Sequence, residues 1–198
     1  MNIDEKLLYS FGAESVKYKV KELIFKEGDH ALYYFQIKEG KVKLNNYNDE
    51  GKEFIQNILG KNQSFGDSLL FLDKLYPTNA TALIPSEIIR ISKSNFLELL
   101  RIHPDVSLSM NACLSQRLYY KVLMTQYMSC QNPVLRLNGL MEYLKSYQES
   151  TCQHTFPVEL TRQQIANLTG LRVETVIRVL KKMEKENLVK LENRRILF

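Results

Sequence analysis

The chain has 198 residues, 44% of them hydrophobic and 25% charged, and a formal net charge of +5. This composition is ordinary for a globular protein and excludes a long disordered segment. The N-terminal residues include early acidic side chains and lack the apolar core of a secretory signal. No stretch approaches the ~18 consecutive apolar residues that a membrane-spanning helix requires. We therefore expect a cytoplasmic protein with no membrane partner.

The cysteines and the short motifs argue against a metalloprotein or an enzyme. Cys113, Cys130 and Cys152 are an odd number at wide spacings, whereas structural zinc and iron–sulfur sites usually need about four clustered ligands. The sequence contains no phosphate-binding loop, nucleophile elbow or paired-histidine metal motif. We therefore expect reduced thiols, no metal site and no enzymatic activity; an enzyme or a nucleotide-binding adaptor is the alternative.

Positive charge is concentrated at the C-terminal end of the chain. Residues 133–198 contain 11 Lys and Arg against 7 Glu, a net charge of +4, whereas the first 132 residues carry only +1. This asymmetry is typical of a surface that contacts nucleic-acid phosphates. A solvated helix face explains the charge equally well, so the assignment depends on the motifs that follow.

The N-terminal half shows a pattern of short strands separated by turns. Tyr, Phe, Ile and Val are enriched between clusters of Gly, Asn and Asp, which is the signature of β-hairpins in a sandwich or barrel. The predicted strands cover residues 23–25, 31–37, 42–47, 53–59, 80–84 and 87–91.

Helical periodicity begins after Ser92. A short helix over residues 94–100 ends at His103, and Pro104 then opens a long helix that runs to about Cys130. Two apolar registers run along this long helix. The first register has the four-three spacing of a two-stranded coiled coil and passes through Leu114, Leu118, Lys121, Thr125 and Met128. The second passes through Cys113, Tyr120, Met124 and Tyr127.

Apolar surface on both sides of the long helix predicts two packing partners. We expect one side to pack on the β-domain and the other on a second copy of the chain, which makes the protein a homodimer. The predicted dimer contacts are Leu114, Leu118, Thr125 and Met128. The alternative is a long helix that packs only within its own chain.

A further helix follows the long one. Asn132 can cap it and Pro133 can occupy its first turn. The predicted helix spans residues 134–147, and its expected core side chains are Leu135, Leu140, Leu144 and Tyr147. Residues 148–155 read as a polar connector.

The last forty residues predict a winged helix-turn-helix. After a short strand over residues 156–160, Thr161 and Gln164 form a capping box, and the helix they begin stops at Gly170. A second helix covers residues 173–186, and two strands, 188–191 and 195–198, resemble a wing. Small Ala166 permits close approach, and the residues expected to lock the two helices together are Ile165, Leu168, Val176, Val179 and Leu180. An ordinary helical hairpin is the alternative.

The second of these helices carries the residues expected to contact DNA. Its N-terminal turns would reach base edges through Arg172, Glu174, Thr175 and Arg178. Arg178 can donate two hydrogen bonds to guanine, and Glu174 can accept one from a cytosine amino group. The alternative is a purely structural role, in which Glu174 and Arg178 form an i,i+4 ion pair on the helix surface. The predicted phosphate contacts are Thr161, Arg162, Gln163, Lys181 and Lys182.

Taken in order, several segments resemble the cyclic-AMP receptor protein and fumarate–nitrate regulator family along nearly the whole chain. They are Ile24-Phe25-Lys26-Glu27-Gly28-Asp29, the hairpin around Gly40, Phe65-Gly66-Asp67, Pro77-Thr78-Asn79-Ala80-Thr81, the long helix, and residues 160–188. The resemblance implies an α+β protein with three parts. These are an N-terminal β-roll of jelly-roll type (residues 1–103), a dimerisation helix (104–131) and a C-terminal winged helix-turn-helix (132–198). It implies a DNA-binding transcription regulator that acts on palindromic promoter sites, with RNA polymerase as a partner. The placement of the N-terminal turns of the second helix at the base edges also follows from this resemblance.

Departures from the family concern the ligand of the roll. The resemblance places a ligand pocket at Gly66, Asp67, Thr78, Asn79 and Lys121. Nucleotide-binding members have Glu and Arg where this chain has Asp67 and Thr78, and Thr cannot supply the charge that pairs with a cyclic phosphate. The sequence therefore argues against cyclic AMP, and it identifies no cofactor. It favours neither haem nor an iron–sulfur cluster, since the N-terminal cysteines of cluster-binding members are missing. Lys121 keeps another anionic ligand open, and a ligand-independent roll is the alternative.

The reading helix resembles the fumarate–nitrate regulator branch. Val173 stands where the cyclic-AMP branch has Arg, while Glu174 and Arg178 match both branches. The resemblance implies a palindrome with TTGA-like half-sites. Ile177 replaces the usual Ser of that branch, so the outer bases of each half-site do not follow from it.

Overall fold

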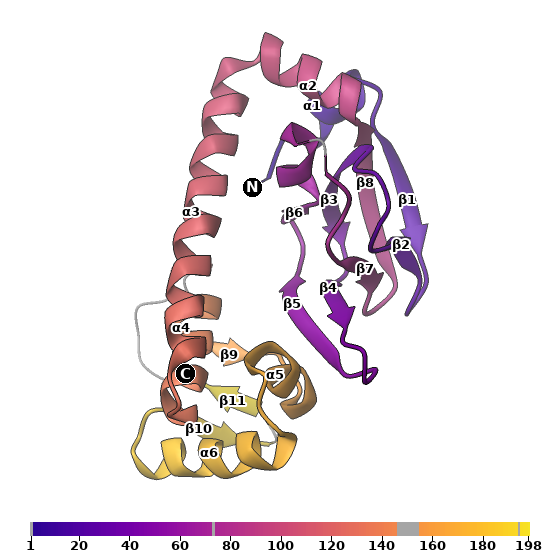
Figure 1. The fold of residues 1–198 in the computed structure, drawn as a ribbon. Helices are drawn as coiled ribbons and strands as arrows, with labels where there is room; N and C mark the ends of the chain where they lie inside the picture. The colour runs from indigo at the N-terminus through magenta and orange to yellow at the C-terminus, as the bar shows by residue number, and fades with distance from the viewer. Residues whose placement is uncertain (1, 73, 146–154, 194) are drawn as a thin grey trace. The chain divides into compact units, whose positions relative to one another are not determined.

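The computed structural model describes residues 2–72, 74–145, 155–193 and 195–198. The chain forms two compact units, residues 1–115 and 116–198, and the boundary falls within the longest helix. Figure 1 shows strands gathered in the first unit and mostly helices in the second. No helix of the described residues is long and apolar enough to cross a membrane.

The first unit is built from two four-stranded antiparallel sheets, as Figure 1 shows. One sheet has the order β1 (Glu14–Tyr18), β8 (Ser86–Ser92), β3 (Tyr33–Glu39) and β6 (Ser64–Phe65). The other has the order β2 (Leu23–Phe25), β7 (Asn79–Ala82), β4 (Val42–Tyr47) and β5 (Glu53–Leu59). The predicted β-roll is therefore confirmed. The strand predicted at residues 31–37 is shifted by two residues, and the one predicted at 80–84 begins one residue earlier and ends two residues earlier.

The core of this unit is one apolar cluster that takes residues from both sheets and from the helices. Its largest fully buried side chains include Tyr34, Phe65, Ile88, Ile89 and Phe96. Alternation accounts for part of this burial, because successive side chains of a strand point to opposite faces of the sheet. Consecutive Ile88 and Ile89 are both buried, so both faces of β8 are covered at that point. In β8, for example, Ile89 and Ile91 are buried while Arg90 between them is half-exposed.

Two N-terminal elements were not predicted from the sequence. Helix α1 (Glu5–Ser10) begins at Asp4, whose carboxylate accepts the backbone N–H of Leu7 at 3.0 Å. Among the described strands, β1 pairs with β8 alone, which lies far along the chain, as in the partnership of Glu14 with Arg90. An edge strand of this kind has no strong alternation of its own, so its pairing depends on long-range contacts.

The short helix η1 (Asp67–Phe71) lies between β6 and β7, and β8 is followed by α2 (Lys93–Ile102) and the 26-residue helix α3 (Pro104–Ser129). The long predicted helix is therefore confirmed. Its first turns pack on the core of the first unit through Val106, Met110 and Leu114. Further along, Leu118 is 66% exposed and Val122 is also exposed.

The second register of the long helix packs within the second unit against α4 (Pro133–Lys145). The Tyr127 hydroxyl donates to Glu142 Oε2 at 2.9 Å, and the Tyr120 ring meets Tyr143 edge-on with centroids 5.6 Å apart. The expected cap of α4 is confirmed, since Asn132 Oδ1 accepts the Val134 N–H at 2.9 Å.

One expected core residue of α4 was wrong. Leu135 is 46% exposed, whereas Leu137, Leu140 and Met141 are buried. The buried positions follow the i, i+3, i+4 spacing of one helix face, and Leu135 lies on a different side. Leu144 is half-buried. Tyr147 and Cys152 lie outside the described residues.

The remainder of the second unit is the predicted winged helix-turn-helix. It contains β9 (Pro157–Val158), α5 (Arg162–Thr169), α6 (Val173–Lys185), β10 (Lys190–Glu192) and β11 (Arg195–Leu197), and the strands form a sheet of order β10-β11-β9. All the predicted locking residues are buried, namely Ile165, Leu168, Val176, Val179 and Leu180, and small Ala166 is buried among them. Met183, Val189 and Ile196 complete this core.

Candidate DNA-binding surface and roll pocket

Local hydrogen bonds fix where α5 begins. The Gln164 N–H donates to the Thr161 hydroxyl oxygen at 3.1 Å, and the Thr161 N–H donates to Gln164 Oε1 at 2.8 Å. This reciprocal capping box satisfies two of the backbone donors that a helix start leaves without partners. The box that the sequence predicted is thus confirmed.

The turn between the two helices depends on Gly170. This residue ends α5 with φ +68° and ψ 10°, in the left-handed region that L side chains rarely adopt. The Thr169 hydroxyl before it is buried and donates to the Ile165 carbonyl at 2.7 Å. The turn therefore sets the direction of α6 through backbone conformation and one internal hydrogen bond.

Helix α6 separates an apolar face from a charged one. Val176, Val179, Leu180 and Met183 are buried against the rest of the unit. The opposite face forms an open pocket of about 640 Å³ lined by Glu174, Ile177, Arg178, Lys181, Lys182 and Lys185. Four cations against one carboxylate give this face a positive potential. Ile177 lies within it and is 44% exposed.

The predicted base-reading residues occupy different positions on α6. Glu174 and Arg178 are exposed on the charged face. Arg172 is exposed at the N-cap, while Thr175 is half-buried and does not line the open pocket. Among the ion pairs of the described residues there is none between Glu174 and Arg178, so both side chains remain available to solvent.

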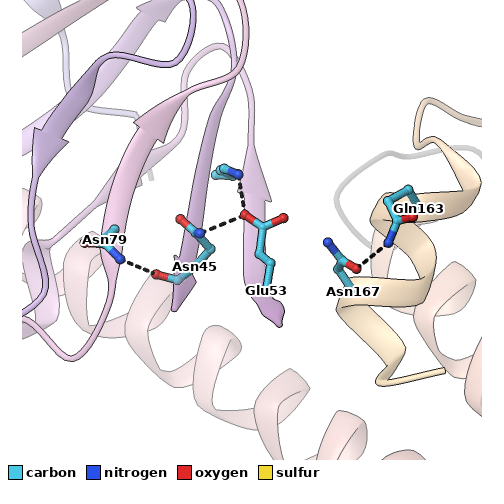
Figure 2. Close-up of polar contacts among 6 residues, drawn as sticks. Asn45, Glu53, Asn79, Gln163 and Asn167 are labelled. Carbon is cyan, nitrogen blue, oxygen red and sulfur yellow. Dashed lines mark hydrogen bonds and ion pairs between the residues drawn. The ribbon is translucent and has the colours of Figure 1, made fainter. Parts of the chain in front are cut away.

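The predicted phosphate contacts fall into two groups. Lys181 and Lys182 lie on α6, where Lys182 Nζ is 3.7 Å from Glu186 Oε1 in a solvent-exposed ion pair. Such exposed pairs contribute little, about 0–1 kcal/mol, so the lysine can exchange partners readily. Thr161, Arg162 and Gln163 lie at the start of α5. Figure 2 shows the Gln163 amide directed along the helix, where Nε2 donates to Asn167 Oδ1 at 2.8 Å.

In the first unit, the segment expected to hold a ligand is closely packed. Gly66 has φ +70° at the start of η1, and Asp67 after it is buried. Asp67 Oδ2 accepts the Ser64 hydroxyl at 2.7 Å and Oδ1 accepts the Ser68 N–H at 2.9 Å. The carboxylate therefore has protein donors on both oxygens.

The other predicted pocket residues are tied to the sheet. Asn79 Oδ1 accepts the Glu27 N–H at 3.0 Å, and Asn79 Nδ2 donates to the Asn45 carbonyl at 3.3 Å, as Figure 2 shows. Thr78 beside it is half-buried. Lys121 belongs to the second unit, so its place in a roll pocket stays a prediction.

Tyr76 is a central residue that the sequence analysis missed. Its ring stacks on Phe25 with centroids 3.7 Å apart, and its hydroxyl donates to the Tyr33 carbonyl at 3.4 Å. Burial, reinforced by the negative charge of Asp67, raises the pKa of the Tyr76 hydroxyl. A tyrosine before a proline carries no special signal in the sequence, so only its packing distinguishes it.

Two domain models match the chain. The model of a cyclic nucleotide-binding domain matches residues 15–103, and the model of a Crp-like helix-turn-helix domain matches residues 136–198. The chain is 28% identical over 176 residues to the cAMP-activated global transcriptional regulator CRP of Haemophilus influenzae, with 87% of this chain and 78% of that protein covered. It is 26% identical over 180 residues to the cAMP-activated global transcriptional regulator Vfr of Pseudomonas aeruginosa, with 87% and 83% covered.

Solved structures share the fold over the whole chain. A CooA mutant from Carboxydothermus hydrogenoformans has a TM-score of 0.79 at 19% identity, covering 100% of this chain and 87% of that one. The c-di-GMP responsive global regulator CLP of Xanthomonas campestris has a TM-score of 0.75 at 18% identity, covering 98% and 99%. At these identities the likeness shows the fold alone.

A roll of two antiparallel sheets, a long helix and a helix-turn-helix with a charged outer face define a DNA-binding transcription regulator. The chain belongs to the Crp/Fnr family, in agreement with the resemblance found in its sequence.

Proposed function

We propose that this regulator binds palindromic promoter DNA as a homodimer, with one α6 helix in the major groove of each half-site. The observation that carries the proposal is the charged outer face of α6, where Glu174 and Arg178 stand beside Lys181 and Lys182. Arg178 reads guanine, Glu174 reads cytosine, and Arg172 and Thr175 contact neighbouring bases. The two lysines, with Thr161, Arg162 and Gln163, hold the phosphates and set the register.

Exposed side chains on α3 support the homodimer. The two registers of this helix have different surroundings: Tyr120 and Tyr127 contact α4 of the same chain, while Leu118 is 66% exposed. An exposed leucine next to exposed Tyr119 and Val122 is apolar surface that a second α3 would cover. In the same arrangement Leu114, Thr125 and Met128 continue the contact on either side of Leu118.

The contacts inside the roll argue that cyclic AMP is not the signal. Among the described residues at Gly66, Asp67, Thr78 and Asn79 there is no cation to pair with a cyclic phosphate. The Asp67 carboxylate is engaged by Ser64 and Ser68, and Tyr76 fills space beside Gly66. Two candidate functions then differ in what the roll does. In the first, another small ligand in the roll controls DNA binding. In the second, which these contacts favour, the regulator binds DNA without any ligand in the roll.

A thermal-shift comparison separates the two candidates. A ligand present at about 100 times its dissociation constant adds roughly 2.7 kcal/mol to stability. We expect cyclic AMP to leave the melting temperature unchanged while the protein still binds its DNA site tightly. A clear rise in melting temperature with cyclic AMP contradicts the second candidate. A rise with 2-oxoglutarate or haem favours the first candidate, a regulator controlled by a ligand in the roll.

Cytoplasmic location and contact with RNA polymerase follow from the same proposal, because a promoter-bound regulator acts where transcription takes place. Co-purification of RNA polymerase on promoter DNA, with and without this protein, tests that contact. Recruitment and blocking then differ in whether the polymerase gains or loses occupancy.

The base-reading role is tested with duplexes selected from a random pool by the full-length protein. Recovered half-sites whose centres lie about 10–10.5 base pairs apart support the dimer. We expect Arg178→Ala to lose about 1–3 kcal/mol of discrimination against substituted half-sites. Lys182→Ala should weaken selected and random DNA equally and reduce the salt slope by about one.

The matched control is Arg101→Ala, which removes an exposed arginine from α2 in the first unit. We expect this variant to bind like the unchanged protein. If Arg178→Ala lowers binding to selected and random DNA by the same factor, Arg178 contacts phosphate and the assignment is wrong.

A further inference from the structure

A cavity of about 670 Å³ lies on the outer face of the sheet formed by β2, β7 and β4, entirely within the first unit. Along β4, Val42 and Leu44 belong to the core cluster, so the alternating Lys43 and Asn45 point to the opposite face. This cavity is therefore separate from the roll interior around Gly66. Its volume lies in the range of small-molecule sites, about 300–1,000 Å³.

Asn45, one of the residues that line this cavity, has an amide oxygen without a hydrogen-bond donor. Asn45 is only 1% exposed, and its Nδ2 donates to Glu53 Oε1 at 2.7 Å. Figure 2 shows Asn45 between Asn79 and Glu53. Because a carboxylate only accepts hydrogen bonds, the NH₂ group must face Glu53, and the amide cannot be turned the other way. None of the described residues donates to Asn45 Oδ1.

An orphaned acceptor of this kind calls for a partner, since buried polar groups nearly always have one. The neighbouring Lys43 ammonium pairs with the same Glu53 oxygen, and it does not donate to Asn45 Oδ1. A bound molecule that presents an O–H or N–H group would complete the hydrogen bonding of Asn45.

Charge adds a second requirement. No acidic side chain lines the cavity, and Lys21 and Lys26 bring two further ammonium groups to its rim. Among the ion pairs of the described residues, neither of these two lysines takes part. With Lys43 compensated by Glu53, the rim carries a charge of about +2, which suits a dianion.

The turn that presents Lys21 is held in place. Lys21 has φ +67°, which is unusual for a residue with a side chain. Its N–H donates to the Ala82 carbonyl at 2.8 Å, and the Ala82 N–H donates to the Glu22 carbonyl at 3.0 Å. These two backbone bonds tie the turn to the end of β7, so Lys21 is positioned before any ligand arrives, which lowers the cost of binding.

The remaining walls are apolar although they face solvent. Leu23 is 50% exposed and Tyr47 is 56% exposed, and both line the cavity. We propose that this outer cavity binds a small phosphate monoester that has a ring or other apolar body and at least one O–H or N–H donor. Lys21 and Lys26 bind the phosphate, which carries about −1.5 to −2 charges at neutral pH. Asn45 Oδ1 accepts the donor, and Tyr47 and Leu23 cover the body.

Pyridoxine 5′-phosphate is a suitable test compound, because it joins a ring and hydroxyl donors to a dianionic phosphate. Binding to the full-length protein is followed by calorimetry, with pyridoxine and inorganic phosphate as partial compounds. We expect saturable binding of pyridoxine 5′-phosphate and a loss of about tenfold or more in affinity for each partial compound. Amide chemical shifts should move at residues 20–26, 43–47 and 79–83.

The critical variant is Lys21→Ala/Lys26→Ala, and its matched control is Lys6→Ala/Lys61→Ala, which removes two exposed lysines that do not line the cavity. We expect the first to lose about tenfold or more in affinity and the second to bind like the unchanged protein. Equal losses in both variants, shifts centred on Gly66 and Asp67, or no saturable binding would each overturn the proposal. None of these outcomes bears on DNA binding, which α6 carries.

Discussion

Tyr76 lies flat on Phe25, with 3.7 Å between the ring centroids and 10° between the ring planes. The ring centroids of Phe25 and Phe65 are 6.0 Å apart, and Phe35 stacks on Phe65 with 5.1 Å between their centroids. The four rings therefore form one aromatic cluster. The cluster occupies the space beside Gly66, where a Cβ atom would stand only 3.2 Å from the Tyr76 hydroxyl. The space beside Gly66 is therefore occupied by side chains of the first unit.

Removing the Tyr76 ring should open this cluster. We expect Tyr76→Ala to lower the free energy of unfolding of the first unit by about 3–5 kcal/mol, because it deletes a buried ring and leaves a cavity. Hydrogen exchange of the Ile89 amide measures this loss. The control is Tyr9→Ala, since Tyr9 is exposed, and it should change stability little. A loss of similar size at both positions contradicts the packing role of Tyr76.

Two leucines of α4 separated by one residue should respond differently to truncation. Leu137 is 0% exposed and Leu135 is 46% exposed. We expect Leu137→Ala to cost about 2–5 kcal/mol in the second unit, whereas Leu135→Ala should stay within about 1 kcal/mol. Urea denaturation of the two variants measures the difference. A larger effect at Leu135 would mean that it contacts a partner not present in the single chain.

Gly170 and Gly60 offer a matched pair for backbone conformation. A Cβ atom added at either meets nothing within 4 Å, but only Gly170 has a positive φ, +68°. We expect Gly170→Ala to cost about 1–2 kcal/mol through the left-handed conformation alone. Gly60→Ala should leave the stability of the folded protein unchanged or raise it by about 0.4–1 kcal/mol, because alanine lowers the conformational entropy of the unfolded chain. Thermal denaturation compares them, and equal changes would show that the turn adjusts its backbone freely.

Charge placed on the exposed side of α3 should disrupt the proposed dimer. We expect Leu118→Glu to convert the protein to monomers, because two buried carboxylates would face each other across the helix pair. Sedimentation velocity measures the change. Leu97→Glu, on the exposed side of α2, should leave the assembly unchanged. If Leu118→Glu remains a dimer, the contact lies on another face.

The predicted features that proved right depend mainly on local signals. The capping box of Thr161 and Gln164, the left-handed Gly170 and the buried spacing of Val176, Val179 and Leu180 all lie within a few residues of one another. Such signals act over one or two helical turns, so the pattern of residue types is sufficient to predict them. The strands of the roll were found for the same reason, through alternation between turn residues.

The features that the sequence analysis missed depend on which distant residues meet. Leu135 and Leu137 have the same side chain, and only the position of the neighbouring helices decides which one is buried. Strand β1 exists because β8 pairs with it. Burial is a property of the whole packed unit, so it cannot be obtained from the spacing of one segment.

Residue types and their order thus predicted a Crp/Fnr regulator with a helix-turn-helix, and both the family and this domain are confirmed. Only the packed structure revealed that Tyr76 stacks on Phe25 beside Gly66 and that Asn45 is buried with an amide oxygen lacking a donor. The physical reason is that a chemical group present in the sequence becomes a site only when long-range contacts remove it from water.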